Sequence, residues 1–380
     1  MAENTKTTEQ IYAEIDRVYR INAEKVLNAF TKNRVAASHF AGTNGYGYDD
    51  TGRDVADKVF ADVLGKEKAI VRYAFANGTH ALSTALFGIL RPNDTVLFYG
   101  EPYDTLKNVI WGKSGSLTDW GVKAIIADAL LNIPPQTRVI YIQRSRGYLL
   151  RDSMSVSEIN LVINVVREIY PTVITLVDNC YGEFCEETEP DADLIVGSLI
   201  KNLGAGIAQT GGYIAGRADL VEQCADRLYT VGTGFEIGCT LNSTREILSG
   251  LFRAPSAVAS ARKSAAYAAE VFKNMGYDTY FTNDITLIIK LGSADKLKQF
   301  CHTIQANSPV DSHLTPEPWA MPGYDCDVIM AAGGFVSGAS IELSADAPLR
   351  EPYCVYLQGG IDFEMARIAI DRTAAAIGHK

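Results

Sequence analysis

Several patterns that mark other classes of protein are missing from this 380-residue sequence. No apolar run approaches the ~18 residues that a membrane-spanning helix needs. The polar start, "MAENTKTTEQ", lacks the apolar core of a standard secretory signal. We therefore expect a protein without a membrane segment, located in the cytoplasm.

Patterns that bind metals or form disulfides are missing as well. The seven cysteines include no C-x-x-C pair, and the five histidines are scattered along the chain. In a long chain of this kind, such cysteines are typically reduced core residues. We expect neither a disulfide framework nor a metal site.

The charge balance excludes a polycationic chain. There are 45 acidic and 35 basic residues, giving a net charge of −10 at pH 7, so nucleic acid is not an expected partner. The 47% hydrophobic content is enough for sizeable cores, and the length of 380 residues indicates two or three domains.

What is present is a regular alternation of helical and strand patterns. An amphipathic helix is expected over residues 8 to about 33, and a glycine-rich loop over residues 42–54. From Val55 onward, helices and apolar strands alternate, which predicts a mostly parallel sheet covered by helices on both faces. The predicted strands of this sheet are residues 69–72 and the segments "DTVLFYG", "KAIIAD", "RVIYIQRS", "VITLVDN" and "DLIVGSL".

After Thr240 the pattern changes. Helical segments are followed by candidate strands in "ITLIIKL", "DVIMAAGGF", "SIELSAD" and "YCVYLQGG", and by a last helix over residues 363–377. This order predicts a smaller α+β domain behind a linking helix. We therefore divide the chain into an N-terminal helix and interface loop (1–54), an α/β large domain (55–245), and a linking helix with a C-terminal small domain (246–380).

One lysine is placed unusually, at the carboxyl edge of the predicted sheet. In "SLIKNLGAGIAQTGG", Lys201 lies between an apolar strand and a glycine-rich turn, and Asp178 ends the preceding strand. Ligands bind beyond the carboxyl ends of the strands in sheets of this kind. A lysine there ordinarily pairs with a carboxylate or extends to the surface, so a chemical role needs support from its neighbours.

Pyridoxal phosphate (PLP) chemistry needs the residue types found around this edge. Lys201 offers an amine for a covalent link to the cofactor, Asp178 can hold the ring nitrogen protonated, and Tyr103 can stack on the ring. Taken singly, each residue also has a structural explanation, such as a turn, a cap or a core contact.

A phosphate cradle is predicted at the start of the helix that follows "FAN". Unpaired backbone N–H groups at a helix N-terminus favour an anion, and here they belong to Gly78, Thr79 and His80. The hydroxyl of Ser198 adds a further donor in this hypothesis. The alternative is an ordinary helix start that binds no ligand.

These blocks resemble PLP-dependent enzymes of fold type I. The resemblance is to the sulfur amino acid lyases, which include cystathionine lyases and methionine gamma-lyase, and within them to the group named aluminium resistance proteins. It implies the roles given above, and a homodimer or homotetramer whose subunits share active sites. It extends over about residues 40–360 and rests on "GTNGYGYDDTGRD", "NGTHALSTALFGILRPNDTVLFYGEPYDTL", "LVDNCYGEF", "GSLIKNLGAGIAQTGGYIAGR" and "SIELSADAPLREPYCVYLQGG".

The sequence departs from the better-known lyases at several positions. Ile200 stands where those enzymes usually have a threonine before the lysine, so one phosphate or ring contact is missing. Those enzymes also carry a Y-x-R segment that reaches into the neighbouring subunit's site. This chain has Tyr46, Gly47 and Tyr48 there, with Arg53 displaced, and we expect the two tyrosines to serve the phosphate in the partner's site.

A substrate carboxylate is best bound by a guanidinium, which makes a bidentate contact. Arg350, before the segment "YCVYLQGG", is the residue we assign to substrate binding. Surface pairing with Glu351 is the alternative for this arginine. Arg144 and Arg146 in "QRSRGY" are rival candidates for the substrate.

The resulting hypothesis is a PLP-dependent carbon–sulfur lyase that acts on a sulfur amino acid such as cystathionine or methionine, by β- or γ-elimination. We expect Lys201 to act as a general base with a pKa lowered by burial, and Tyr103 to assist at the reacting centre. Transamination, racemisation or replacement with the same cofactor is the alternative. A nucleotide-binding regulatory protein is disfavoured, because neither a G-x-G-x-x-G after the first strand nor a G-x-x-x-x-G-K-[ST] is present.

Overall fold

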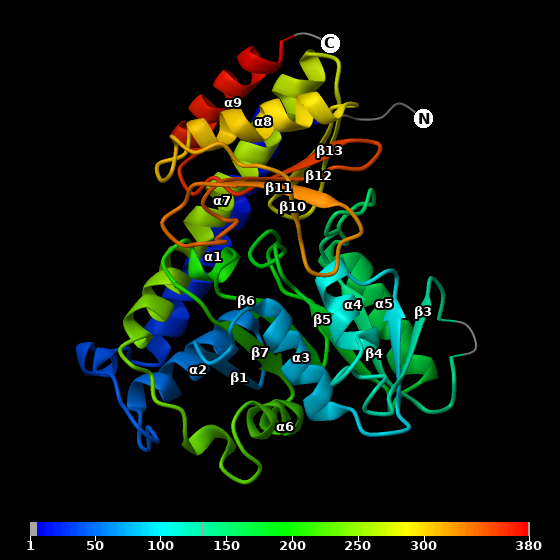
Figure 1. The fold of residues 1–380 in the computed structure, drawn as a ribbon. Coiled ribbons are helices and arrows are strands. Elements are labelled where there is room, and N and C mark those ends of the chain that lie inside the picture. Colours follow the sequence, from blue (N-terminus) through cyan, green and yellow to red (C-terminus); the bar gives the residue numbers. More distant parts are fainter. Residues whose placement is uncertain (1–5, 131–132, 379–380) are drawn as a thin grey trace.

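The computed structural model describes residues 6–130 and 133–378 of the chain. The first five residues of the polar N-terminal stretch, and His379, lie outside the described residues. Two β-sheets dominate the fold, and the long helix α7 (Thr244–Asn274) extends from the larger to the smaller one, with its first part in the core of the larger sheet and its last part in the core of the smaller sheet (Figure 1). The predicted α/β fold class, with a large mostly parallel sheet and a second smaller sheet, is confirmed.

The first sheet consists of β1 (Lys68–Arg72), β2 (Thr95–Tyr99), β3 (Lys123–Ala127), β4 (Thr137–Gln143), β5 (Ile174–Asp178), β6 (Leu194–Ser198) and β7 (Gly212–Gly216). Their order across the sheet is β1-β7-β6-β5-β4-β2-β3. All neighbours are parallel except that β7 runs antiparallel to both β1 and β6. The carboxyl ends of β4, β5 and β6 therefore meet at one edge, where a ligand site is expected.

Helices cover both faces of this sheet, as the alternating pattern predicts. Within β1, Ala69 and Val71 pack into one hydrophobic core and Ile70 into the other, as the two-residue period of a strand requires. The core of the first face is formed with α2 (Thr51–Leu64), α5 (Val156–Ile169) and part of α7, and that of the second face with α3 (Gly78–Ile89), α4 (Asp104–Trp111) and α6 (Ala218–Leu228).

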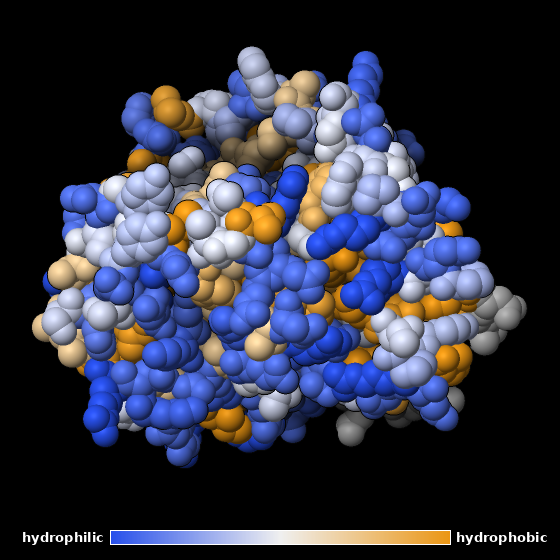
Figure 2. All heavy atoms as spheres, turned by 90° about the horizontal axis from the view of Figure 1, so that it is seen from below, coloured by the Kyte–Doolittle hydropathy of each residue, from blue (hydrophilic) through white to orange (hydrophobic). Residues whose placement is uncertain are grey.

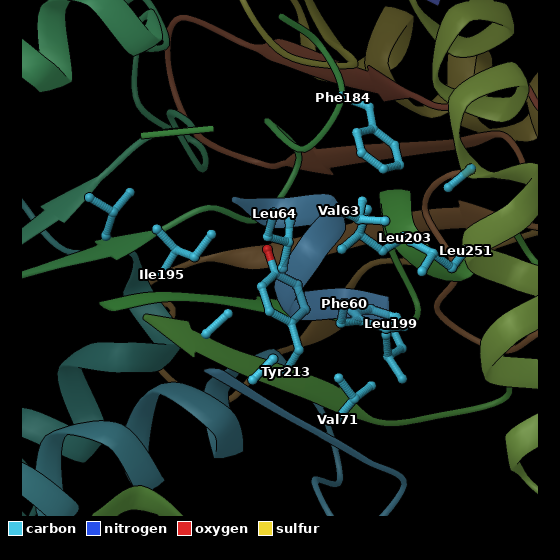
Figure 3. Packing of buried hydrophobic residues seen from close by; sticks show 14 of the residues in the cluster. Phe60, Val63, Leu64, Val71, Phe184, Ile195, Leu199, Leu203, Tyr213 and Leu251 are labelled. Carbon is cyan, nitrogen blue, oxygen red and sulfur yellow. The ribbon is translucent and has the colours of Figure 1, made fainter. Parts of the chain in front are cut away.

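Figure 3 shows the first of these cores from close by. Phe60 from α2, Val71 from β1 and Leu251 from α7 are all buried there. Tyr213 of β7 lies in the same core, with its ring 6.3 Å from that of Phe60. This packing fixes α2 and α7 against β6 and β7, and so holds the strand end that precedes Lys201.

The second sheet consists of β8 (Asp278–Phe281), β9 (Thr286–Lys290), β10 (Trp319–Ala320), β11 (Asp327–Ala332), β12 (Ser344–Pro348) and β13 (Cys354–Gln358). It is antiparallel throughout, in the order β10-β11-β12-β13-β9-β8. Helices α8 (Ala294–Ala306) and α9 (Phe363–Ile377) pack on it, and in Figure 1 the sheet lies between them and the larger sheet.

The N-terminal helix packs on α7 and α2, and the loop after it bonds to the segment that precedes α7. Helix α1 (Thr8–Lys32) begins with a capping box between Thr7 and Gln10 and packs along α7. The short helix η1 (Ala37–Phe40) follows. The sequence pattern placed the start of the next helix at Val55, but α2 begins at Thr51. The Asp50 carboxylate accepts a hydrogen bond from the Arg53 N–H at 2.8 Å and so caps the helix at this earlier position.

The predicted strand over "SIELSAD" is also shifted. Strand β12 begins only at Ser344, because the residues before it form a turn. The Glu342 N–H donates to the Ala339 carbonyl at 3.1 Å, and the Glu342 carboxylate accepts from the Phe335 and Val336 N–H groups at 2.8 Å each. Two further short helices are η2 (Asn202–Gly204) and η3 (Gly234–Glu236).

The surface seen from below is largely hydrophilic, with apolar residues in separate small groups (Figure 2). In the described ranges, no helix is both long and apolar enough to cross a bilayer. The same residues include no cluster of three or more histidine, cysteine, aspartate or glutamate side chains that could hold a metal ion.

Candidate active site

A pocket of about 340 Å³ lies between the larger sheet and the C-terminal part of the chain. It falls in the size range of small-molecule sites, roughly 300 to 1,000 Å³. Its walls include the ends of β5 and β6, the start of α3, and residues from the segment between Met321 and Asp346. A larger groove between α1 and α5, of about 790 Å³, contains none of the predicted site residues.

Lys201 projects into this pocket just after β6. Its Nζ donates hydrogen bonds to the Tyr181 hydroxyl at 2.6 Å and to the Ser340 hydroxyl at 2.7 Å. Within the described residues no carboxylate forms an ion pair with it, so the ordinary explanation for a lysine at this position does not apply. Sequence reasoning missed both partners, although Tyr181 lies in the quoted segment "LVDNCYGEF".

The expectation of a lowered pKa for Lys201 is wrong for this arrangement. Burial lowers the pKa of the amine, but the Tyr181 hydroxyl, Cys180 and the Asp346 carboxyl together outweigh burial, and the pKa is raised. The groups responsible surround Nζ inside the pocket. Lys201 is therefore held as an ammonium by its neighbours rather than neutralised by desolvation.

Asp178 ends β5 in the same pocket, as predicted, and is almost fully buried. Its Oδ2 accepts a hydrogen bond from the Tyr141 hydroxyl at 3.0 Å, and its Oδ1 accepts one from the Cys180 N–H at 3.1 Å. Burial raises the pKa of this carboxyl despite these bonds. A cationic partner in the pocket would therefore stabilise the ionised form.

The start of α3 and the end of β6 form a compact polar corner. Gly78 and Thr79 line the pocket, and their N–H groups have no partner in the described part of the chain. A Cβ on Gly78 would lie 3.0 Å from the Ser198 Cβ and 3.3 Å from the Cys180 Sγ, so only glycine leaves this corner open. The Ser198 hydroxyl is buried without a hydrogen-bond partner. The corner thus presents unused donors to an anion.

His80 does not belong to this corner, contrary to the prediction. Its backbone N–H donates to the Asn77 Oδ1 at 2.8 Å, which is the N-cap bond of α3. Its imidazole Nδ1 accepts from the Ala76 N–H at 3.1 Å, and the side chain is exposed. The His80 N–H, which the sequence analysis assigned to the phosphate, is therefore used to cap the helix.

Tyr103 lies beside this corner, at the N-cap of α4. Its hydroxyl is 2.8 Å from the Thr79 Oγ1, and its N–H donates to the Gln143 Oε1 at 2.8 Å. Burial raises the pKa of the phenol well above its usual range, so the side chain stays neutral. These contacts fix the ring beside the polar corner.

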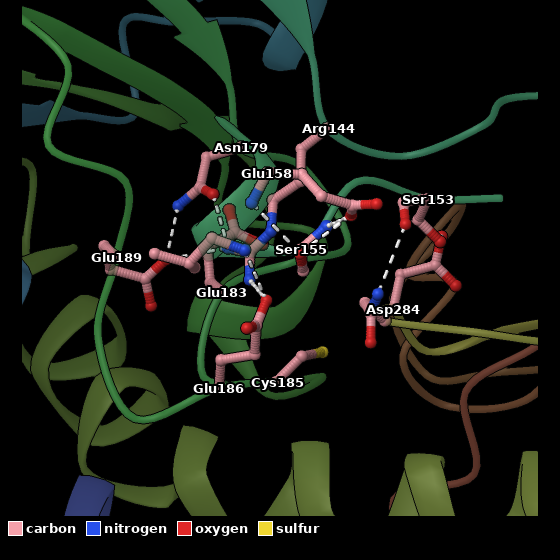
Figure 4. A network of polar contacts seen from close by, with 12 residues as sticks. Arg144, Ser153, Ser155, Glu158, Asn179, Glu183, Cys185, Glu186, Glu189 and Asp284 are labelled. Atoms are coloured by element: carbon pink, nitrogen blue, oxygen red, sulfur yellow. Dashed lines mark hydrogen bonds and ion pairs between the residues drawn. The ribbon is translucent and has the colours of Figure 1, made fainter. Parts of the chain in front are cut away.

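The two arginines considered for the substrate are used inside the protein. Arg144 is fully buried and binds Asn179 at 2.7 Å, Glu186 at 2.9 Å and Glu189 at 3.0 Å (Figure 4). Arg146, also fully buried, donates to the Tyr280 carbonyl at 3.1 Å. Neither lines the pocket.

Arg350 is likewise absent from the pocket wall, so its assignment to substrate binding is not supported. Its guanidinium forms an ion pair of 2.9 Å with Asp325, rather than with Glu351, on the surface. It lines a separate shallow depression of about 200 Å³. The Arg350 carbonyl accepts a hydrogen bond from the Tyr353 N–H in the turn before β13, and the position of Arg350 in the sequence did not indicate that its side chain lines this other depression.

The loop before α2 holds its two tyrosines outward. The Arg53 guanidinium is buried and donates to the Gly47 and Gly238 carbonyls at 2.8 and 3.2 Å, which anchors the loop. Tyr46 and Tyr48 are 71% and 57% exposed, and their rings stack on each other at 5.5 Å. Arg53 is therefore a structural residue of its own subunit, whereas the tyrosines contact little of it.

Comparison with known proteins places this geometry in a family. The family model described as methionine gamma-lyase matches residues 1–378. Uncharacterized protein YnbB of Bacillus subtilis is 42% identical over 384 aligned residues, covering 95% of this chain and 91% of that protein. A solved structure from Listeria monocytogenes, a candidate cystathionine beta-lyase involved in aluminium resistance, has 43% identity and a TM-score of 0.92, with 98% of this chain and 97% of that chain covered.

A more distant structure is similar in fold alone. It is a candidate O-acetylhomoserine (thiol)-lyase from Campylobacter jejuni that carries N'-pyridoxyl-lysine-5'-monophosphate, with 15% identity, a TM-score of 0.58, and 86% of this chain and 85% of that chain covered. It shares the PLP fold type I architecture. Because the family model matches nearly the whole length of the sequence, the chain belongs to the methionine gamma-lyase family.

Proposed function

We propose that this protein is a PLP-dependent carbon–sulfur lyase that eliminates a thiol from the β or γ carbon of a sulfur amino acid. The observation that carries the proposal is Lys201, held in a pocket at the carboxyl edge of the sheet by two hydroxyl groups, with no carboxylate of the described residues in an ion pair with it. Asp178 and the unused donors beside Gly78 face the same pocket.

The residues present fit PLP. Gly78, Thr79 and Ser198 offer unpaired donors for its phosphate, and Asp178 offers a buried carboxylate for its ring nitrogen. Tyr103 offers a fixed aromatic face, and Lys201 an amine for covalent attachment. When bound, PLP supplies an electron sink for the bond-breaking carbon of the substrate.

Lys201 is the group that moves protons in this proposal. Its Nζ takes the α proton once it is free and neutral, and it returns a proton as the thiol leaves. The Tyr181 hydroxyl, at 2.6 Å from Nζ, orients the amine and stabilises its charged form between these transfers. Asp178 is buried and Lys201 is partly buried, so both side chains act in an environment less polar than water.

Transamination, racemisation or replacement is the alternative class, since it uses the same lysine and aspartate. The reaction products distinguish elimination from these three reactions. Elimination from an S-alkyl-cysteine gives a thiol, ammonia and pyruvate, and from an S-alkyl-homocysteine a thiol, ammonia and 2-oxobutanoate. We expect purified protein with PLP to release thiol and ammonia in equal amounts from one of the two. An amino acid that keeps its carbon–sulfur bond while its amino group is transferred or its α carbon is inverted would reject the lyase.

We also propose that the active unit is at least a dimer, in which Tyr46 and Tyr48 complete the partner's site. Two stacked, exposed tyrosines on an anchored loop suit an interface better than a free surface. Two-fold homodimers are the commonest oligomers.

Subunit exchange tests this shared site. An inactive Lys201→Ala protein is mixed with an inactive double variant, Tyr46→Ala with Tyr48→Ala. A hybrid dimer then contains one site with both Lys201 and an intact loop, so we expect activity to return in part. If exchange is confirmed with tagged subunits and no activity returns, each subunit supplies its own loop and the shared site is rejected.

A further inference from the structure

The pocket carries more acid than the proposed chemistry uses. Among the described residues, the charged side chains that line it are Lys201 and three carboxyls, on Asp104, Asp178 and Asp346. No arginine of the described chain is among its lining residues. Asp104 is paired with Lys107 at 3.1 Å, and Asp178 is assigned to the cofactor ring. Asp346 interacts with Lys201 through charge but has no ion-pair partner among the described residues.

Asp346 is built into the pocket wall on β12 and is only 8% exposed. Its Oδ2 accepts hydrogen bonds from the Tyr148 hydroxyl and from the Gln358 Nε2, each at 2.7 Å. Its Oδ1 has no partner among the described residues, and no cation there lies within ion-pair distance of it. One carboxylate oxygen is thus fixed in place while the other is unused.

Aromatic rings accompany this carboxyl. Tyr148 and Tyr324 line the same pocket, and their ring centres are 5.4 Å apart. Tyr356 packs on Tyr148 at 4.8 Å and donates to the Tyr148 carbonyl at 2.7 Å, which fixes that side chain. A carboxylate beside aromatic rings is a chemistry that binds ammonium groups, through charge and through the ring faces.

We propose that Asp346, with Tyr148 and Tyr324, forms a subsite for a second cationic group on the substrate. The substrate class is then a thioether amino acid that carries an ammonium on its leaving-group side. Lys201 acts on this carboxyl through charge but forms no ion pair with it, so a substrate ammonium would give the carboxylate a directly paired cation and offset the cost of burying it. This inference rests on the proposed lyase function and names the substrate for the same pocket.

Matched probes test the subsite. S-(2-aminoethyl)-L-cysteine and S-propyl-L-cysteine have side chains of similar length, and only the first carries the distal ammonium; the homocysteine analogues serve if elimination is at the γ carbon. We expect the wild-type kcat/KM to favour the aminoethyl probe. In Asp346→Asn that preference should fall by about 10-fold or more, mainly through KM, because a hydrogen-bonded charge pair is lost. Asp346→Glu should restore part of it.

A binding measurement gives a second readout that does not depend on turnover. Isothermal titration with L-lysine and L-norleucine, which differ at the distal ammonium, should show tighter binding of lysine to the wild type and loss of that difference in Asp346→Asn. Asp325→Asn removes a surface carboxylate by the same substitution and should keep the preference. Circular dichroism and melting temperature confirm that each variant is folded.

The outcomes separate the two proposals. A wild type that cleaves both thioethers without preferring the aminoethyl probe overturns the subsite and leaves the lyase standing. Equal losses for both probes in Asp346→Asn also overturn it, because they mean that the carboxyl acts only through the charge of Lys201. If neither thioether is cleaved, the lyase proposal fails, and the lysine and norleucine titrations alone decide the subsite.

Discussion

Lys201→Ala is expected to lower kcat by at least about 10³-fold, because the general base and the covalent anchor of the cofactor are lost together. The other contacts proposed for PLP, at Gly78, Thr79, Ser198 and Asp178, are unchanged. The variant should therefore still bind PLP, although more weakly, and dialysis should remove the cofactor. Absorbance after dialysis and steady-state thiol release measure the two effects.

Lys68→Ala is the matched control for this experiment. Lys68 pairs with Glu222 at 2.8 Å on the surface, away from the pocket walls, so its loss should leave turnover near the wild-type value. Wild-type turnover in Lys201→Ala would remove this lysine from the mechanism. Equal damage in both variants would point to a general effect on folding.

Asp178→Asn should lower kcat by about 10² to 10³-fold, the range observed when a preorganised charge contact to a reacting centre is removed. The amide has almost the same shape, so it fits the cavity that Tyr141 and Cys180 form around the carboxyl. It cannot hold a ring nitrogen protonated, and the electron sink of the cofactor is weakened. The loss should therefore be much larger in kcat than in PLP affinity.

Titration with PLP and kinetics on the same preparation give both quantities for Asp178→Asn. Asp325→Asn again serves as the surface control. Wild-type turnover in Asp178→Asn would reduce the aspartate to a structural residue, and a loss of PLP binding as large as the loss of kcat would make it a binding residue only.

The sequence could place Lys201 and Asp178 because their signals are local. An apolar run followed by a polar residue shows where a buried strand ends: β5 ends at Asp178 as predicted, and β6 ends at Ser198, shortly before Lys201. The last helix, Phe363–Ile377, also has the predicted bounds, since Asp362 caps it with a bond to the Met365 N–H.

Partners from distant parts of the chain could not be predicted in this way. Ser340 reaches the pocket from the turn before β12 and Asp346 from β12 itself, and the effect of Asp346 on the pKa of Lys201 depends on how the two sheets pack. Together with Tyr181 and Cys180, Asp346 reverses the direction that burial alone gives. Strand β7 was missed because its glycines weaken the strand pattern, although pairing with both β1 and β6 stabilises it.

Competition between local contacts explains two other errors. At the start of α3, Asn77 caps the helix and takes the His80 N–H that had been assigned to phosphate. Arg350 was chosen for its position before a strand, but Asp325 lies near enough to pair with it on the surface. In both places the residue types were compatible with either role, and only the three-dimensional arrangement distinguishes them.

The central claim is that Lys201 carries the cofactor, and trapping that bond tests it most directly. Purified protein supplied with PLP should be yellow, and borohydride should bleach the visible band. Mass spectrometry of the digested protein should then find one pyridoxyl group on the peptide that contains Lys201. A colourless protein that takes up no added PLP, or a pyridoxyl group on a different lysine, would contradict the account.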